Sequence, residues 1–546
     1  MMPKYAEYLG ADLTLKLFYF FSIGLEYAVY AGLLLAWGGC LWLLGKSLLR
    51  QTEGRESARK TAFFFAVFSA AAFCLAAALP ARSGYDNNHD LIALGTSFLG
   101  LDLAQLLSFK EISPLFTDAV SDLFTGRSLS GLLNKNRLLL CASALVLYGT
   151  LRRFGFGKPV AGLTCVFFGF NSLALLNASS FATTMANVFI VLVSVFAAAE
   201  VYAADRVGAR ELFWTFSALL LVLCSRYEFL PAAVLLSGAA LAQAARRGAL
   251  KAGATGSAVS AAGLFILGLC AYHINSVANH VYLSGTPGPL SNLKHYLWTS
   301  NFGVLAGGRA AAALVLACAA FLLAAAGWAL TREKLARNSA ALLLLVLWAV
   351  YFSFIYQPKD YYPLHFMRHQ LYFFLPFVYL FALCLDGAAD LLRFFNFGRA
   401  LKYGFAALGA SLYIYLNAKA AFSFNGERRT NDIELEFLMK SQGEWKKECR
   451  VIYPVNDERR RLLEKYFPFD GEDGRGSGGC RLNYVSPAPA VFKEGGAALP
   501  KAGNRPAAWR SISFEHAFYT VWEERETREP VRVTIGFYPL AGPEKP

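Results

Sequence analysis

Long apolar runs recur along most of this chain and constrain its fold more than any other feature. About 20 apolar residues in a helix cross the ~30 Å hydrocarbon core of a bilayer. Runs of this kind lie at 24–46, 61–80, 137–152, 159–176, 181–201, 211–225, 229–246, 256–276, 308–330, 339–357, 369–388 and 401–423. Hydrophobic residues make up 56% of the chain and charged residues 16%. The sequence therefore predicts an all-α polytopic membrane bundle of about twelve transmembrane helices.

The positions of the charges predict the orientation of this bundle. Lys and Arg concentrate in alternate turns: Lys46, Arg50, Arg55, Arg59, Lys60, Arg152, Arg153, Lys158, Arg206, Arg210, Arg246, Arg247, Lys251, Arg332, Lys334, Arg337, Arg393, Arg399 and Lys402. Short cationic loops stay in the cytoplasm. The Ser225–Glu228 turn, the Tyr356–His369 loop and the C-terminal tail are then expected outside. Because the net charge of +14 lies mainly in these turns, the expected partner is the lipid bilayer, and no nucleic-acid partner is expected.

We divide the chain into a transmembrane domain at 1–424 and an extracytoplasmic α/β domain at 425–546. The first contains a large external loop, 81–136, with six carboxylates: Asp86, Asp90, Asp102, Glu111, Asp118 and Asp122. Apolar spacing predicts amphipathic helices around Leu91–Leu107 and Leu115–Leu123, lying along the membrane surface.

The C-terminal domain is expected to contain a βαβ unit and a hairpin. Strands are predicted at Arg450–Val455 and Arg481–Val485, on either side of a helix at Glu458–Tyr466, after a first helix at Asp432–Lys440. The hairpin is predicted from Ser511–Glu523 and Val531–Tyr538. Cys449 and Cys480 each precede one of the parallel strands, so a disulfide between them is a hypothesis for an oxidising exterior.

The external loop opens on an acidic motif, Gly84–Asp90. Asp86, His89 and Asp90 stand at i, i+3 and i+4 and share one face of any helix that starts there. Asp86 is suited to act as a general base on a hydroxyl. The alternative uses are a divalent metal site built from all three residues and an N-capping first turn without chemistry. No other cofactor is expected.

Two further motifs place charges where membrane spans meet the exterior. Ser225-Arg226-Tyr227-Glu228 interrupts two apolar runs, which is costly unless the charges face a polar cavity or pair with each other. The second motif carries Lys359, Arg368 and His369 just before a span. Cations there either bind a phosphate leaving group or snorkel to the interface within an aromatic belt.

The order of these motifs resembles that of the GT-C superfamily of integral membrane glycosyltransferases, which use polyprenyl-phosphate-linked sugars. The resemblance covers most of Ala62–Phe424: the acidic motif Gly84–Asp90, then Asn177-Ala178-Ser179-Ser180, then Ser225–Pro231, then Arg368–Pro376 opening a late span. The chain departs from the family pattern in having Asn87 and Asn88 between its carboxylates, and one additional span at the start.

The resemblance implies an inverting transfer of a sugar to a hydroxyl acceptor on a glycan, lipid or protein. Asp86 matches the family's catalytic carboxylate. Substrate contacts are expected from Asp90, His89, Arg226, Glu228, Lys359, Arg368 and His369, with the cations on the donor phosphate. Compact loops favour a bacterial inner membrane, with the active site on the periplasmic side.

Two other functions fit a chain of this kind. A multi-pass transporter or lipid flippase also needs many spans with polar groups between them, but is expected to show internal repeats with paired broken helices. A membrane scaffold that presents the C-terminal domain leaves the acidic loop unexplained. The sequence has no Walker loop, Rossmann glycine fingerprint or HExxH motif.

Overall fold

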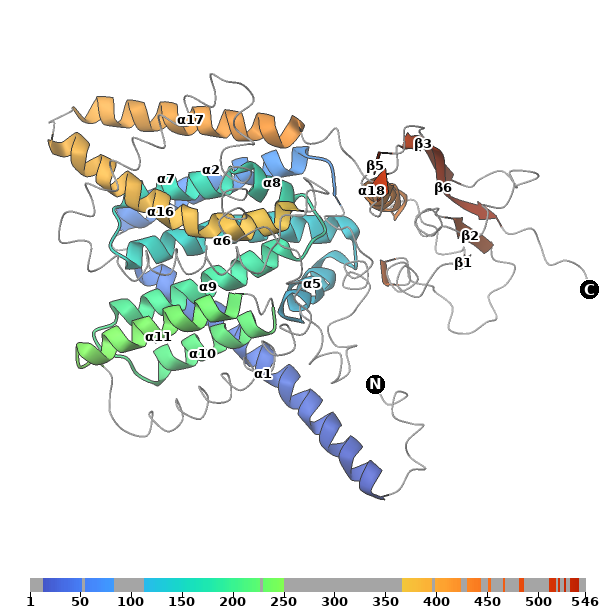
Figure 1. The fold of residues 1–546 in the computed structure, drawn as a ribbon, viewed down its shortest axis with the longest axis horizontal. Coiled ribbons are helices and arrows are strands. Elements are labelled where there is room, and N and C mark those ends of the chain that lie inside the picture. The colour runs from blue at the N-terminus through green and yellow to red at the C-terminus, as the bar shows by residue number, and fades with distance from the viewer. Residues whose placement is uncertain are drawn as a thin grey trace, which may run out of the picture.

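The computed structural model describes a helical bundle followed by a small sheet (Figure 1). The described residues are 13–51, 55–82, 112–225, 229–249, 366–394, 398–423, 430–442, 450–452, 465–466, 481–485, 510–516, 519–520, 525–526 and 531–539. The predicted spans at 256–276, 308–330 and 339–357 and the predicted helix at 91–107 lie outside them.

Every predicted span within the described residues coincides with helical structure. The helices are α1 (Leu13–Gln51), α2 (Arg55–Ala78), α5 (Ile112–Thr125), α6 (Leu129–Arg153), α7 (Lys158–Gly169), α8 (Ser172–Ala178), α9 (Thr184–Ala203), α10 (Ala209–Leu223), α11 (Leu230–Arg246), α16 (Phe366–Phe394), α17 (Arg399–Ser423) and α18 (Thr430–Gln442). Leu- and Ala-rich runs favour helix by propensity.

Length and apolarity qualify three of the described helices to cross a membrane on their own. These segments are Tyr30–Arg50, Ala58–Ala78 and Thr184–Ala203, and α7 with α8 adds a fourth if the pair forms one bent span. Large apolar side chains point outward from α1, α2 and α17, among them Trp42, Phe63 and Leu408. Such exposure suits a surface that faces lipid. These are the features of a membrane protein, while the total of twelve spans stays a prediction.

Helix α9 lies at the centre of the bundle and is buried along almost its whole length. A helix that is apolar on every side belongs in a core, and α9 packs against α6, α10 and α11. Trp37 of α1 stacks on Phe189 of α9 and on Phe116 of α5, with ring centroids 6.4 and 5.2 Å apart. Aromatic stacking therefore joins three elements around α9.

The predicted single span at 159–176 is wrong in one respect, because the helix breaks. Helices α7 and α8 meet at an angle of 60°. Asn171 caps α8 by accepting a hydrogen bond from the Leu173 amide at 2.9 Å. Asn is a preferred N-cap residue, so the break is encoded locally, although the apolar run continues through it.

The external loop is shorter than predicted, because α6 begins at Leu129 and not near residue 137. Leu129, Leu132 and Leu133 are buried on one face of this extension. The helix predicted around Leu115–Leu123 exists as α5, but its first turn packs into the core instead of lying on the membrane surface. Ile112 and Leu115 are each 1% exposed.

Strands follow the last helix, α18. They are β1 (Arg450–Ile452), β2 (Arg481–Val485), β3 (Arg510–His516), β4 (Tyr519–Thr520), β5 (Arg525–Glu526) and β6 (Val531–Pro539). Four form one sheet in the order β1-β2-β6-β3, and β4 pairs with β5. β1 and β2 are parallel, as the sequence predicts, while β3 and β6 are antiparallel. That 425–546 is a separate extracytoplasmic domain stays a prediction.

Candidate functional site

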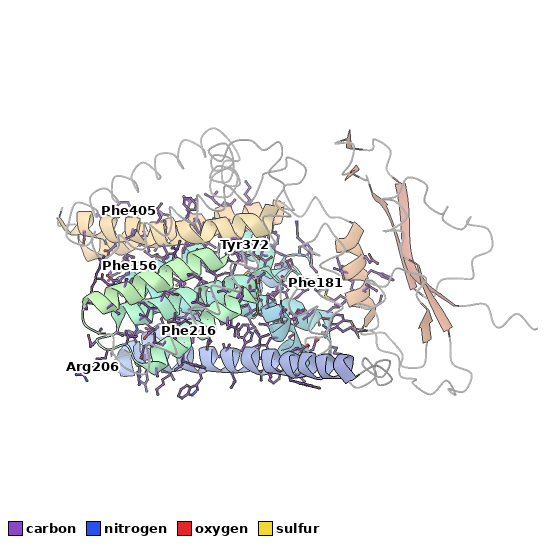
Figure 2. The ribbon with its side chains drawn as sticks, turned by 60° about the horizontal axis from the view of Figure 1, so that its bottom comes forward. Phe156, Phe181, Arg206, Phe216, Tyr372 and Phe405 are labelled. Carbon is purple, nitrogen blue, oxygen red and sulfur yellow. The ribbon has the colours of Figure 1, made fainter. Side chains whose placement is uncertain are left out.

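The two ends of the bundle differ in chemistry. Phe156 and Arg206 lie at one end in Figure 2, and Phe181 and Tyr372 lie toward the other, on the side of the C-terminal strands. At the first end Arg153 forms an ion pair with Glu200, and its Nη2 donates to Ser47 Oγ at 3.2 Å. This end also carries the predicted cytoplasmic cations of α6 and α9–α10. We call it the basic end and the opposite one the outer end.

At the outer end, the turn between α8 and α9 bonds to Arg82, where the external loop begins, and to α6. The Arg82 amide donates to Ser179 O at 3.0 Å, and the Phe181 amide donates to Arg82 O at 2.9 Å. From α6, Asn136 Nδ2 donates to the carbonyls of Ser180 and Ala182 at 2.7 and 3.0 Å. Arg82 and Asn136 are therefore held on one turn, 179–182.

Asn187, one turn into α9, links two more segments to this place. Ser225 Oγ donates to Asn187 Oδ1 at 2.5 Å, and Asn187 Nδ2 donates to Tyr372 Oη at 3.1 Å. The Phe229 ring meets the Tyr372 ring edge to face, with centroids 4.7 Å apart. All four side chains are buried. We call Asn187, Ser225, Phe229 and Tyr372 the outer clamp.

The outer clamp joins the segments that carry the predicted charges. Arg226 and Glu228 lie outside the described residues, in the stretch bounded by Ser225 and Phe229. Arg368 and His369 belong to the first turn of α16, about one helical turn before Tyr372. Ser225 and Phe229, which bound that stretch, and the start of α16 therefore lie at the same part of α9.

The remaining predicted site residues lie outside the described residues: Asp86, His89, Asp90 and Lys359. Three of these, Asp86, His89 and Asp90, make up the predicted metal site, which therefore stays a prediction. Among the residues that the structure describes, no group of three metal-ligating side chains occurs. Cys449 and Cys480 also lie outside. The residues that follow them, Arg450 and Arg481, are register partners in the sheet, and the disulfide stays a hypothesis.

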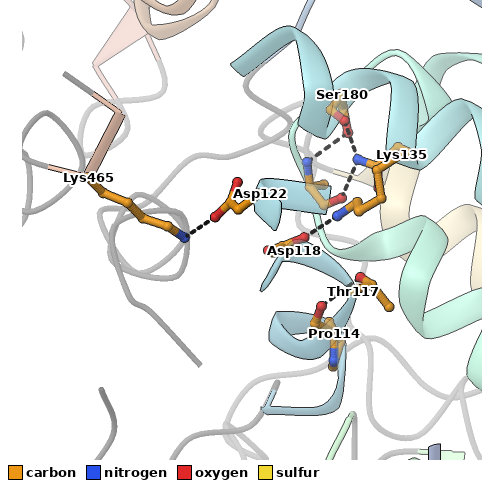
Figure 3. A network of polar contacts seen from close by, with 9 residues as sticks. Pro114, Thr117, Asp118, Asp122, Lys135, Ser180 and Lys465 are labelled. Atoms are coloured by element: carbon orange, nitrogen blue, oxygen red, sulfur yellow. Dashed lines mark hydrogen bonds and ion pairs between the residues drawn. The ribbon is translucent and has the colours of Figure 1, made fainter. Parts of the chain in front are cut away.

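A buried network of charges lies beside the outer end (Figure 3). Asp118 on α5 pairs with Lys135 on α6, and Asp122 Oδ2 lies 3.4 Å from Lys465 Nζ. Lys465 Nζ also lies 5.1 Å from the centroid of the Tyr466 ring. The four charged side chains are between 3 and 12% exposed. Ions this buried need partners, and here each carboxylate has a lysine.

The burial of this network shifts the pKa values of two of its groups. Burial raises the pKa of the Asp122 carboxyl above its ordinary value, the Lys465 ammonium opposes this, and the Asp118 charge adds to it. Burial and then the charges of Asp118 and Asp122 hold the pKa of the Tyr466 phenol well above its usual range. The network therefore favours a neutral Tyr466 and a carboxyl at Asp122 whose charge depends on Lys465.

Sequence reasoning missed Asn136 and Asn187, which organise this end of the bundle. Each is a buried amide: Asn187 lies within an apolar run and Asn136 just before one. Polar side chains inside membrane spans commonly bond across helices, and this signal could have singled out Asn187. Lys135 falls within the predicted external loop, and no local pattern points to its partner Asp118, which lies 17 residues away.

No family model, curated protein or solved structure matches this chain.

Proposed function

We propose that this protein is a glycosyltransferase that moves a sugar from a polyprenyl-phosphate-linked donor to a hydroxyl acceptor at the outer side of the membrane, with inversion. One observation carries the proposal: Arg82, two residues before the acidic motif, Ser225, directly before Arg226, and Tyr372, near the start of α16, all bond to the 179–182 turn or to the first turn of α9, which follows it. These segments are far apart in sequence, and each brings a predicted site residue.

Chain length limits how far those residues can lie from their anchors. Asp86 follows Arg82 by four residues, which span at most about 14 Å. Arg226 directly follows Ser225, and Arg368 lies one turn from Tyr372 in α16. A carboxylate from one segment and cations from two others can therefore meet around one bound donor. Such a combination suits transfer of a sugar from a phosphate.

The roles follow from the chemistry of the transfer. The acceptor oxygen forms a bond to the anomeric carbon while the bond from that carbon to the donor phosphate oxygen breaks. Asp86 takes the proton of the acceptor hydroxyl. Arg226, Lys359 and Arg368 stabilise the negative charge that grows on the leaving phosphate. Asp90, His89, Glu228 and His369 are proposed to contact substrate, with a metal ion at Asp86, His89 and Asp90 as the other use of those three.

The rest of the proposal concerns location and acceptor. We place the protein as a multi-pass protein in a bacterial inner membrane, with the outer end facing the periplasm. The acceptor is a glycan, lipid or protein. The C-terminal region, of which α18 and the strands β1–β6 are described, is proposed as an acceptor-binding or accessory module because it follows the bundle on the side of the outer end (Figure 1).

The break between α7 and α8 is the feature a transporter would share, since broken helices often form ion and substrate sites. Here residues at the break form hydrogen bonds with α17. Asn171 Nδ2 donates to Tyr413 Oη at 3.0 Å, and the Ser172 amide donates to Asn417 Oδ1 at 2.9 Å. The polar groups at the bend are thus bonded to a neighbouring helix, and this bend does not favour transport over transfer.

The proposal is tested by sugar transfer in membranes that carry the wild-type protein or Asp86→Asn. A panel of radiolabelled polyprenyl-phosphate sugars serves as donors. Removing a general base typically costs about 10²–10⁴-fold in rate, so the variant should transfer at least about a hundredfold more slowly at equal protein level.

Asp102→Asn is the matched control, because Asp102 is a carboxylate of the same loop outside the acidic motif. It should transfer at close to the wild-type rate. Equal transfer by Asp86→Asn and wild type would remove Asp86 from the chemistry. The absence of transfer from every donor by wild-type protein would count against the glycosyltransferase and for the transporter.

A further inference from the structure

The charge network beside the outer end joins a late part of the chain to the external loop. Asp118 and Asp122 stand at i and i+4, so they share one face of α5. We call these two residues the acidic face of α5. Two carboxylates at this spacing repel each other, and burial strengthens the repulsion. While both carboxylates are ionised, the face is therefore stable only with cations against it.

The two cations come from different parts of the chain. Lys135 belongs to α6, the next helix, and pairs with Asp118. Lys465 belongs to the C-terminal region and pairs with Asp122. Within the described residues, Asp122 Oδ1 is buried without a hydrogen-bond partner. The contact of Oδ2 with Lys465 is the ion pair that the structure describes for this carboxylate.

Burial on the C-terminal side matches that on α5. The Lys465 side chain is 7% exposed, and Tyr466 beside it is 2% exposed. Lysine is seldom buried unless it is paired. A lysine on the surface of an independently tumbling module would instead be hydrated. The burial of both partners indicates a docked contact, since each charge would regain water if the segments separated.

From this geometry we propose that Lys465, with Tyr466 packed beside it, forms a latch on the acidic face of α5, which couples the C-terminal region to the external loop. Helix α5 directly follows residues 83–111, so whatever holds α5 also sets where that loop ends. Release of Lys465 leaves Asp122 buried without its cation, and α5 loosens from the bundle. This proposal does not depend on which reaction the outer end catalyses.

Hydrogen exchange measured by mass spectrometry on the full-length protein in nanodiscs tests this latch. Lys465→Met should speed amide exchange in α5 by about tenfold, equivalent to about 1.4 kcal/mol of local stability. Exchange in α9 should stay unchanged, which shows that the bundle remains folded. Lys465→Arg keeps the cation and should restore slow exchange in α5.

Lys440→Met is the matched control. Lys440 forms an i, i+4 pair with Glu436 in α18 at 2.6 Å, but its side chain is 63% exposed, so its loss should leave α5 unchanged. The charge exchange Asp122→Lys with Lys465→Asp should restore much of the protection. Unchanged exchange in α5 on Lys465→Met, or equal acceleration by Lys440→Met, would overturn the latch.

Discussion

Loss of the Asn187 side chain should weaken the outer clamp in a way that a double-mutant cycle can isolate. Asn187→Leu removes two buried hydrogen bonds, the one from Ser225 at 2.5 Å and the one to Tyr372 at 3.1 Å. Each is worth about 0.5–1.5 kcal/mol net, and bonds between helices in membranes average about 0.6 kcal/mol. The expected loss of unfolding free energy is about 1–3 kcal/mol.

The cycle combines Asn187→Leu with Ser225→Ala. Ser225→Ala alone should cost about 0.5–1.5 kcal/mol, and almost nothing when Asn187 is already leucine, because the bond has no acceptor left. Equilibrium unfolding in mixed detergent micelles, followed by circular dichroism, measures the free energies. The coupling between the two changes should therefore be about 0.5–1.5 kcal/mol.

Ser194→Ala is the matched control for this cycle. Ser194 lies in the same helix and is buried, but its hydroxyl donates to Val191 O within α9 at 2.7 Å. Its cost should add to that of Asn187→Leu within about 0.3–0.5 kcal/mol. If Ser225→Ala costs the same in both backgrounds, the Asn187–Ser225 bond does not form and the outer clamp is wrong.

Three further predictions concern other buried polar groups. Asn417→Leu should cost about 1–3 kcal/mol of unfolding free energy in the same assay, because the Ser172 amide at the α7–α8 break loses its acceptor; an unchanged value would contradict that role of α17. Glu200→Gln should lower the unfolding free energy by about 1–3 kcal/mol, which is below the range for fully buried ion pairs because the Arg153 side chain is 30% exposed. Arg153→Met should cost less in the Glu200→Gln background than in the wild type, and equal costs in both would contradict the ion pair. The folded-state pKa of Asp122 is raised, so its contribution to stability is present at low pH and is lost as pH rises through that pKa. In thermal unfolding, the wild type should therefore lose stability relative to Asp122→Asn as the pH rises, and melting temperatures that change in parallel for the two proteins would contradict this.

Much of the helical framework could be predicted because its cause is local. Apolar runs of membrane length place α1, α2, α9 and α17, and no distant residue is needed to recognise them. The parallel pairing of β1 with β2 was predicted in the same way, from two short strands on either side of a predicted helix. These predictions depend on periodicity and composition, which a single sequence displays directly.

The details that failed depend on partners distant in the sequence. Lys135 interrupts the apolar run of α6, so the start of this helix was predicted too late in the sequence. In the structure Lys135 pairs with Asp118, and the helix continues through it. The role of Asn187 requires Ser225 and Tyr372, and Tyr372 lies 185 residues away. No local pattern names such partners, so the outer clamp and the latch emerge only from the fold.

Photo-crosslinking of the donor lipid tests directly whether the donor binds at the outer end. A polyprenyl-phosphate sugar with a diazirine near its phosphate would be irradiated with the full-length protein in nanodiscs, and the labelled peptides identified by mass spectrometry. We expect labels at the outer end, in peptides containing Ser180–Asn187, Ser225–Phe229 or the first turns of α16, and we expect unlabelled donor to reduce them. Labels at the basic end around Arg153 and Arg206, or labelling that unlabelled donor does not reduce, would contradict a donor site at the outer end.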